Sequence, residues 1–410
     1  MASPRQPTSP EVTVDERVRA WLVGAYVVGL ALSITLSETA LILLAVRMVW
    51  RLVRGRAQAS WPLAWPIGAF IVATFLAALR SAHPGASLVS ARTVFLVLSL
   101  WVVLDAVPTV AHARRALGWL LGTLVVTSVV GMGQVALCPR LAPWAPVLGH
   151  VALKCHRAHG FFSIYMTLAG VLNIVLVATV PALLARRSAV SAAALAWVVN
   201  LVAFALTYVR SAWVGFVIGV AVLAAMLPRR RLALAGALVA IVLLLLLLPG
   251  VRGRAESIAD PTDPTSSERV HMWRSGLAMA RDHLLTGVGP GQVRHVYPDY
   301  AAPEVPNKHR GHLHNTPIQM LVERGIIGLA TWLWLFAAFF VRAVGVARRS
   351  RADVEAGALV SGAIAATVAF LIAGLAEHNF GDTEVLLVAT FVMALVFVVE
   401  RETRARPGED

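Results

Sequence analysis

Charged residues are scarce in this sequence. They make up 14% of its 410 residues, whereas 58% of the residues are hydrophobic and the mean hydropathy is +0.73. This balance excludes an ordinary soluble globular protein. Several windows run for about 18 apolar residues or more, which is the length that a bilayer-spanning helix needs. The sequence therefore predicts an all-α integral membrane protein.

Acidic residues are the scarcer charged class, with 22 Asp and Glu against 36 Lys and Arg, for a net charge of +14. In a soluble domain this excess would suggest nucleic acid as a partner. Here no basic module stands outside the apolar runs, so we expect no nucleic-acid partner. The external segments also lack a convincing cage of carboxylates, so we expect no metal and no other cofactor.

Only two cysteines are present, Cys138 and Cys155, and both fall in one predicted external loop. A disulfide is permitted there because that compartment is oxidising, and two independent thiols are the alternative. A zinc site made by Cys155, His156 and His159 is less favoured, because the paired C-x-x-C spacing is missing. Residues 1–17 also lack the basic start and small-residue cleavage site of a signal peptide.

The apolar runs predict about twelve transmembrane helices. They cover residues 18–36, 37–53, 62–79, 88–107, 113–136, 161–185, 190–209, 211–228, 232–249, 315–341, 354–376 and 383–400. The predicted organisation is a cytoplasmic tail (1–17), helices 1–9 (18–249), a large, partly helical external loop (250–314), helices 10–12 (315–400) and a second tail (401–410).

Basic residues alternate in density from one loop to the next. With the N-terminus inside, the short inside segments hold 21 of the 36 Lys and Arg residues. The opposite side holds only six outside the long loop. Because positive residues are retained on the cytoplasmic side, both termini are predicted to be cytoplasmic. The long loop then faces outward, which is the periplasm if the membrane is the inner membrane of a Gram-negative bacterium.

Residues 250–330 form the longest polar stretch between apolar runs. They contain six of the 12 histidines and nine of the 36 Lys and Arg residues. Thr265-Ser-Ser-Glu268 fits a capping box, and Val270, Trp273, Leu277, Ala280 and Leu284 follow at helical spacing, which predicts an amphipathic helix. Gly287-Val-Gly-Pro-Gly291 predicts a flexible turn, and its glycines are only a weak signal for phosphate binding. In a membrane enzyme that acts on a water-soluble group, such a polar segment is the expected place of the active site.

Three arginines are candidate ligands for an anion. Arg210 stands between two apolar runs of the sequence. Burying its charge at the membrane is costly in free energy unless the guanidinium is paired or faces water. Snorkelling to the head-groups is the alternative. Arg269 stands at the start of the amphipathic helix, where it could meet a phosphate beside the helix-terminal amides. Arg157 lies at the mouth of the sixth span, and a solvated surface role is the alternative for both.

His314 precedes Asn315 at the point where the long loop re-enters the membrane. An imidazole titrates near pH 6.5 and is therefore suited to accept a proton at neutral pH. Capping a helix or binding interfacial lipid is the alternative for a single histidine. His309, His312 and His314 could also hold a metal, but their spacing brings all three together in neither a helix nor a strand, so a general base is the preferred interpretation.

Four acids lie at membrane level: Glu323, Glu377, Asp382 and Glu384. Glu323 sits within an apolar helix, where we expect it to pair with an arginine, for which Arg324 is one candidate. A structural ion pair is an alternative to catalysis for each of these acids.

These residues together carry a family resemblance. The sequence from about residue 157 to 330 resembles the bacterial O-antigen ligase and O-antigen polymerase superfamily. The matching motifs are Arg157-Ala-His-Gly-Phe161, Thr207-x-x-Arg-Ser-Ala-Trp213, Arg269-x-x-x-Trp273, Leu285-Thr-Gly-Val-Gly-Pro-Gly291 and His314-Asn-Thr-Pro-Ile-Gln-Met-Leu-Val-Glu-Arg-Gly-Ile-Ile-Gly328.

The resemblance implies a membrane glycosyltransferase that uses an undecaprenyl-pyrophosphate-linked glycan as donor. The acceptor is lipid A-core for a ligase, another lipid-linked repeat unit for a polymerase, and protein for some relatives. It implies His314 as general base and Arg210 and Arg269 as pyrophosphate ligands, to which we add Arg157, with Asn315, Glu323 and His159 in support.

The two branches share these motifs, and the single long loop between spans nine and ten favours a ligase. A twelve-span transporter or flippase is the rival from another class. It is disfavoured because the two halves of the chain show no internal repeat. A non-catalytic membrane scaffold is a third possibility, which leaves Arg210 and His314 unexplained.

Overall fold

The computed structural model describes residues 10–55, 60–141, 147, 154–185, 191–247, 249–258, 260, 263–302 and 308–405. Over these ranges the chain is helical or irregular, with no strand. The helices of the first half are α1 (Pro10–Leu32), α2 (Ile34–Val53), α3 (Ala64–Arg80), α4 (Pro84–Ala91), η1 (Arg92–Leu98), α5 (Ser99–Ala106), α6 (Val110–Leu141), α9 (Tyr165–Leu184) and α10 (Ala192–Ala205). Those of the second half are α11 (Arg210–Met226), η3 (Pro228–Arg230), α12 (Arg231–Leu246), α13 (Pro249–Glu256), α14 (Pro264–Asp282), α15 (Val293–Tyr300), α16 (Thr316–Arg349), α17 (Val354–Ala373), η4 (Asn379–Gly381) and α18 (Thr383–Ala405).

The chain is a multi-pass membrane protein by the composition of its helices. Where the structure describes them, the predicted spans fall largely on helical residues, which confirms the all-α class. Among the described residues, six helical stretches are long and apolar enough to cross a bilayer, one of which combines α4, η1 and α5. The number rises to seven if the bent pair α11 and α12 is one span. The chain bends by 113° between the helices of that pair, and α3 and α10 are shorter apolar helices. Twelve crossings therefore remain a prediction.

The first helix begins earlier than predicted. α1 starts at Pro10, so the second half of the predicted tail is helical. Its Asp15 carboxylate lies 2.7 Å from Nη2 of Arg47 on α2, whose Nη1 lies 3.0 Å from Asp105 on α5. These ion pairs join three helices at one end of the bundle and explain why the helix extends beyond its apolar part.

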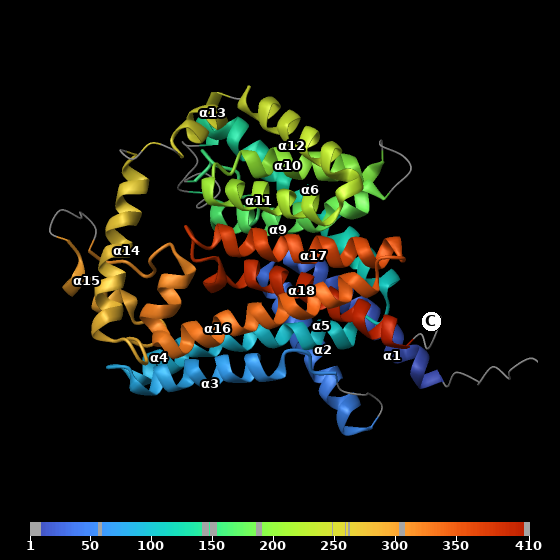
Figure 1. Ribbon diagram of the computed structural model, residues 1–410, viewed down its shortest axis with the longest axis horizontal. Helices are drawn as coiled ribbons and strands as arrows, with labels where there is room; N and C mark the ends of the chain where they lie inside the picture. The colour runs from blue at the N-terminus through green and yellow to red at the C-terminus, as the bar shows by residue number, and fades with distance from the viewer. Residues whose placement is uncertain are drawn as a thin grey trace, which may run out of the picture.

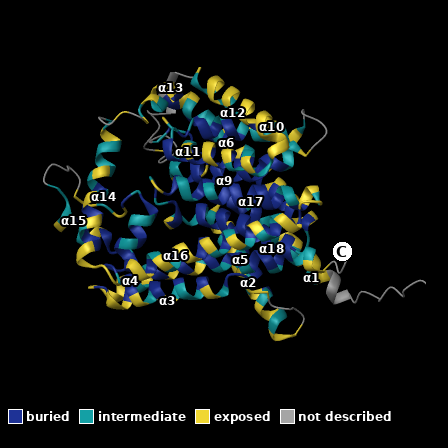
Figure 2. Ribbon diagram, in the orientation of Figure 1, coloured by how far each residue is buried: buried dark blue, intermediate teal, exposed yellow. Residues whose placement is uncertain are grey.

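The core of the bundle is formed by α9, α17 and α18, which are its most buried helices (Figure 2). Small residues allow the backbones to approach closely, which is how membrane helices commonly pack. A Cβ added at Gly362 on α17 would overlap the Ala178 backbone of α9, and one at Gly215 on α11 would meet the Ala369 carbonyl of α17. This packing fixes the ends of α9, α11 and α17 relative to one another.

α16 is kinked at Gly325, inside the span predicted over 315–341, and the helix as a whole remains long and apolar enough to cross a bilayer. Gly325 has φ +64° and ψ −169°, a conformation that strongly favours glycine. The turn after α14 docks at this break: the Ile326 N–H donates to the Leu284 carbonyl at 2.8 Å, and the Val288 N–H donates to the Val322 carbonyl at 2.8 Å. Residues 316–324 therefore form a short buried helix between α14 and the bundle.

The amphipathic helix of the long loop is α14, but its cap and buried face differ from the prediction. The cap is Asp263 rather than Thr265, because Pro264 occupies the first helical turn and the Asp263 side chain accepts the Ser266 N–H. Met272 and Met279 are buried, whereas Leu277 is 45% exposed. Contacts with α15 and the first part of α16 select this face. α14 and α15 lie side by side at one end of the molecule, away from the C-terminus, whereas α13 lies next to α12 (Figure 1).

Candidate active site

His314 is held in an unusual backbone conformation at the start of α16, with φ +46°. Asn315 caps α16 by accepting the Ile318 N–H at 2.9 Å. The Asn315 amide also donates to the Leu375 carbonyl at 2.7 Å. These bonds join the end of the long loop to the segment that follows α17. They bring together two parts of the chain that are far apart in sequence.

The imidazole of His314 is bonded to Glu377, in the segment between α17 and α18. Nδ1 of His314 lies 2.8 Å from Oε2 of Glu377, and the other carboxylate oxygen accepts from the guanidinium of Arg269 on α14. A carboxylate only accepts, so Nδ1 carries the proton of this hydrogen bond. In neutral His314 the lone pair is then on Nε2, which is the arrangement of a general base oriented by an acid.

This pair borders a pocket of about 180 Å³, here called the arginine pocket. Its basic lining residues are Arg157, Arg210, Arg254, Arg269 and Arg310, and its acidic ones are Glu268 and Glu377. Burial and the neighbouring Arg210 and Arg157 guanidiniums lower the pKa of Arg254, which reflects the crowding of positive charge. The pocket is therefore suited to a multiply charged anion such as a phosphate or pyrophosphate.

Arg210 lies at the first position of α11 and is buried, with 8% of its surface exposed. Its Nη2 donates to the Asp263 carboxylate at 2.9 Å and to the Thr265 hydroxyl at 2.8 Å, and its Nη1 donates to Ser257. Hydrogen bonds from Thr265, the Ser266 N–H and Arg210 hold the pKa of Asp263 well below its usual range. Arg210 thus anchors the long loop as well as lining the pocket, and it does not snorkel.

Arg157 differs from Arg210 in having no carboxylate partner within the described chain. Its guanidinium carbon stands 4.4 Å from the ring centroid of Tyr165, the first residue of α9. A cation–π contact orients the group without neutralising it. Arg157 therefore offers the pocket a positive charge that no acid of the described residues neutralises.

The sequence places Arg269 beside free helix-terminal amides at the start of the amphipathic helix, but its position in the structure differs. The Asp263 cap takes up the Ser266 N–H of α14. Arg269 instead lies in the second turn of that helix and pairs with Glu377. It contributes to the pocket through its side chain alone.

None of the three predicted supporting residues lines the pocket, and Asn315 acts as the cap of α16. The buried His159 ring bonds through Nδ1 to the Phe162 carbonyl at 2.9 Å. Glu323 pairs with Arg324 at 2.7 Å, as expected, and accepts the Gly291 N–H at 2.9 Å. A carboxylate of the protein itself thus bonds to the glycine turn that had suggested a phosphate cradle. Glu323 holds the turn against α16 rather than facing the pocket.

The cysteines and histidines raised as metal ligands have other arrangements. Cys138 and Cys155 form a disulfide, so the thiol needed for a zinc site is absent. The centroid of the His312 ring lies 4.3 Å from the ring centroid of His314 and 5.9 Å from that of His378. Within the described part of the chain, no group of three or more His, Cys, Asp or Glu residues could hold a metal ion.

Several pocket residues had no assigned role in the sequence argument. The sequence leaves a structural ion pair and catalysis open for Glu377, as for Asp382, because its contact with His314 depends on the fold. Arg254 and Arg310 counted only toward the charge of the long loop. Tyr165 and Tyr208 also line the pocket. In the sequence, Tyr165 stands close to Arg157 and Tyr208 stands close to Arg210, and this nearness is the one signal that could have suggested them.

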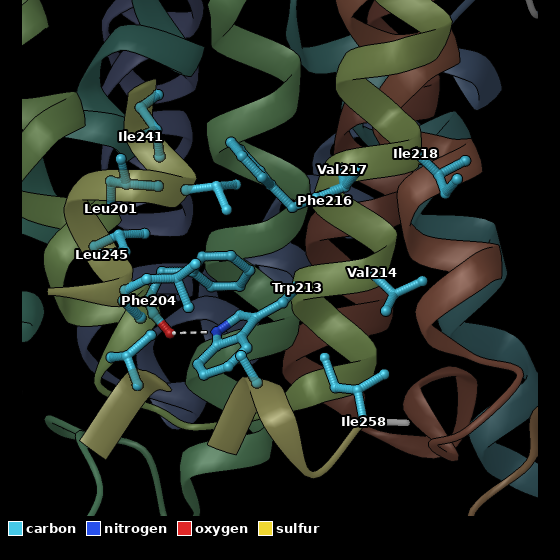
Figure 3. Close-up of a pocket in the computed structure, with 15 residues that line it drawn as sticks. Leu201, Phe204, Trp213, Val214, Phe216, Val217, Ile218, Ile241, Leu245 and Ile258 are labelled. Carbon is cyan, nitrogen blue, oxygen red and sulfur yellow. Dashed lines mark hydrogen bonds between the residues drawn. The ribbon is translucent and has the colours of Figure 1, made fainter. Parts of the chain in front are cut away.

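An apolar groove of about 260 Å³ lies next to the arginine pocket, between α10, α11, α12 and α13 (Figure 3). α13 separates the two, since Val251 and Ala255 line the groove whereas Arg254 lines the pocket. α11 likewise gives Arg210 to the pocket and Trp213 to the groove. The cationic arginine pocket and the apolar groove thus share two helices, α11 and α13.

Comparison with known proteins identifies a family for this region. Residues 195–333 match the family Wzy_C, described as O-Antigen ligase, which confirms the resemblance drawn from the motifs. The match runs from α10 into α16 and contains Arg210, Arg269 and His314, whereas Arg157 and Glu377 lie outside it. The family covers ligases and polymerases, membrane enzymes that act on lipid-linked glycans. No curated protein matches the chain.

Proposed function

We propose that this protein is an O-antigen ligase-type glycosyltransferase. It moves a glycan from undecaprenyl pyrophosphate to a hydroxyl of lipid A-core. The observation that carries the proposal is the His314–Glu377 pair on the wall of a pocket lined by five arginines. The family match at residues 195–333 supports the same assignment.

The reaction requires a base and a stabilised leaving group. Nε2 of His314 takes the proton of the acceptor hydroxyl while that oxygen attacks the anomeric carbon of the donor. The bond from the anomeric carbon to the pyrophosphate oxygen breaks, and undecaprenyl pyrophosphate leaves with the electron pair. Attack from the side opposite the leaving group inverts the anomeric centre. Glu377 keeps the imidazole in the tautomer that can accept the proton and stabilises its charged form.

The arginine pocket holds the pyrophosphate. Guanidinium forks bind phosphate oxygens with two parallel hydrogen bonds and stabilise the charge that grows on the leaving group. Arg157 and Arg269 present their side chains to this group. Arg210 contributes its charge while keeping residues 257–266 in place. We propose that these fixed charges do the work that a divalent cation does elsewhere, so that the reaction needs no metal.

The apolar groove beside the pocket suits the isoprenoid tail of the donor. Trp213, Val214 and Ile258 are among the apolar side chains that face it (Figure 3). A lipid with its tail in the groove would place its head-group beyond α13, where the arginines are. An amphiphile of this kind matches both sites at once.

The test is to incubate purified protein with undecaprenyl-pyrophosphate-linked glycan and lipid A-core in nanodiscs and to look for the glycosidic product. Accumulation of longer lipid-linked glycans without lipid A-core product would assign the polymerase activity instead. Movement of the donor across the bilayer with no new glycosidic bond would indicate a flippase.

The proposed orientation places the arginine pocket in the periplasm, with twelve crossings and both termini in the cytoplasm. Single-cysteine reporters test it in a variant whose Cys138 and Cys155 are serine. Arg230→Cys should react with an impermeant thiol reagent only from the cytoplasmic side, and Arg281→Cys only from the periplasmic side. Labelling of Arg281→Cys from the cytoplasm would reverse the assignment.

A further inference from the structure

A second cavity adjoins the arginine pocket and extends toward the core of the bundle. This inner chamber has a volume of about 210 Å³, and it shares Met166, Val209 and Glu377 with the arginine pocket. Its walls come from the starts of α9, α11 and α18 and from the segment after α17. The volume lies below the roughly 300–1,000 Å³ of sites for drug-sized ligands, which suits a single sugar ring.

The chemistry of the inner chamber is the opposite of that of its neighbour. Of the described residues that line it, none is Arg or Lys, and its charged groups are Glu377 and Asp382. His312 and His378 also line it, and burial lowers their pKa values to about 4 and about 3. Both rings are therefore neutral at physiological pH. A phosphate would meet repulsion here and find no cation.

Two buried polar atoms on residues of this chamber have no hydrogen-bond partner. They are the Ser211 hydroxyl oxygen and Nδ1 of His378. Ser211 is 7% exposed, and it follows Arg210 on α11. A buried polar group without a partner is costly, so such groups commonly mark the place of a ligand or an ordered water. Carboxylates accept hydrogen bonds, while a serine hydroxyl and a neutral imidazole both donate and accept.

We propose that the inner chamber is a carbohydrate subsite that binds the hydroxyls of one sugar ring of a glycan substrate. The inference rests on the proposed function. Sugar hydroxyls can donate to Asp382 and Glu377 and can both donate to and accept from Ser211 and the two imidazoles. The chamber also stands where the substrate requires a sugar, because the donor ring is joined directly to the pyrophosphate and the acceptor ring must reach the same carbon.

The same α11 terminus thus serves three parts of a substrate. Arg210 faces the arginine pocket, Ser211 and Ala212 face the inner chamber, and Trp213 and Val214 face the apolar groove. Successive residues of a helix point in different directions, so one turn can separate anion, carbohydrate and lipid.

The test uses Ser211→Val, which removes the hydroxyl and adds volume, and Asp382→Asn, which removes the charge. Ser361→Val is the matched control, because this buried α17 serine bonds to the Gly357 carbonyl of its own helix. In nanodiscs, KM is measured separately for donor and acceptor. Affinity is measured for undecaprenyl pyrophosphate that carries no glycan. Monodisperse elution checks folding.

Either inner-chamber variant should raise the KM of a glycan substrate roughly two- to tenfold, as expected for one or two lost hydrogen bonds. Affinity for the glycan-free lipid should stay unchanged, as should every constant of Ser361→Val. An effect on donor KM assigns the chamber to the donor sugar, and an effect on acceptor KM assigns it to the acceptor sugar.

The proposal is overturned if both variants leave both KM values unchanged, or if affinity for the glycan-free lipid falls in parallel. Failure of the proposed function would look different. Wild-type protein would then form no glycosidic product.

Discussion

Nδ1 of His314 and Oε2 of Glu377 are 2.8 Å apart, although 63 residues separate them in the sequence. The contact joins the segment before α16 to the segment after α17. It depends on two further hydrogen bonds between the same segments, from Asn315 to the Leu375 carbonyl and from the Thr316 N–H to the Gly374 carbonyl, both at 2.7 Å. The orientation of the proposed base is therefore set by the packing of two helices rather than by its neighbours in sequence.

Replacing His314 should separate catalysis from binding. His314→Ala is expected to lose ~10²–10⁴-fold in turnover, because it removes the group that takes the acceptor proton. Donor affinity should stay near that of the wild type. Turnover and donor affinity measured in nanodiscs check this. A His314→Ala protein that turns over normally would remove the proposed base.

Replacing Glu377 should affect the same step through the imidazole. Glu377→Gln keeps the size of the side chain but can present its amide to Nδ1, so the tautomer is no longer fixed. We expect turnover to fall by roughly 10- to 1,000-fold, within the range for disrupted acid–base catalysis. Glu268→Gln is the control, since Glu268 pairs with Arg310 in the same pocket without contacting His314. Equal losses in the two variants would indicate a general effect of pocket charge.

The arginines should divide into two kinds. Arg157→Ala is expected to weaken donor binding roughly 10- to 100-fold with little change in thermal stability, because no carboxylate of the described chain loses its partner. Arg210→Ala should weaken donor binding and also destabilise the protein by about 1–3 kcal/mol, since Asp263 and Thr265 lose a buried hydrogen-bond donor. Asp263 keeps a second cation, because Arg254 lies 3.5 Å from its carboxylate.

Two further variants sharpen this comparison. Arg210→Lys should rescue poorly, because an ammonium cannot reproduce the guanidinium fork. Asp263→Asn should reproduce the loss of stability while leaving the charge of Arg210 in the pocket. If Arg210→Ala proves as stable as the wild type, its bonds to the long loop have little energetic weight.

Chelation should leave the activity intact. Because fixed guanidiniums are proposed to stabilise the pyrophosphate, dialysis against EDTA is expected to change turnover by less than about twofold. The assay compares treated protein with and without added magnesium or zinc. Loss of activity that either ion restores would contradict the arginine-only mechanism and direct attention back to His309, His312 and His314.

Acidification should destabilise the protein through His312 and His378. Their pKa values in the folded state are about 4 and about 3, whereas an unfolded histidine titrates near 6.5. As the pH falls through the interval between these values, the unfolded state binds protons that the folded state does not. The free energy of unfolding therefore decreases below about pH 6.5. Thermal unfolding between about pH 7 and pH 5 should show a smaller decrease for His312→Gln and His378→Gln than for the control His283→Gln, on the exposed end of α14.

The sequence alone determined the membrane class, the all-α fold and the resemblance to the ligase and polymerase superfamily. These properties depend on local patterns of the sequence: apolar runs of bilayer length, charge counts in loops, and short motifs around Arg210, Arg269 and His314. The amphipathic helix at 264–282 was also predicted, since its period is local.

The tertiary structure decided which side chains meet. Glu377 faces His314, Arg210 is held by Asp263, and Glu323 faces the glycine turn and not the pocket. None of these pairings has a fixed spacing in sequence. The break at Gly325 and the buried face of α14 have the same origin. The first depends on where the Leu285 carbonyl docks, and the second depends on which neighbours cover the helix. Local propensity sets where a helix forms, and only long-range packing sets where it breaks, which face it buries and which charges it pairs.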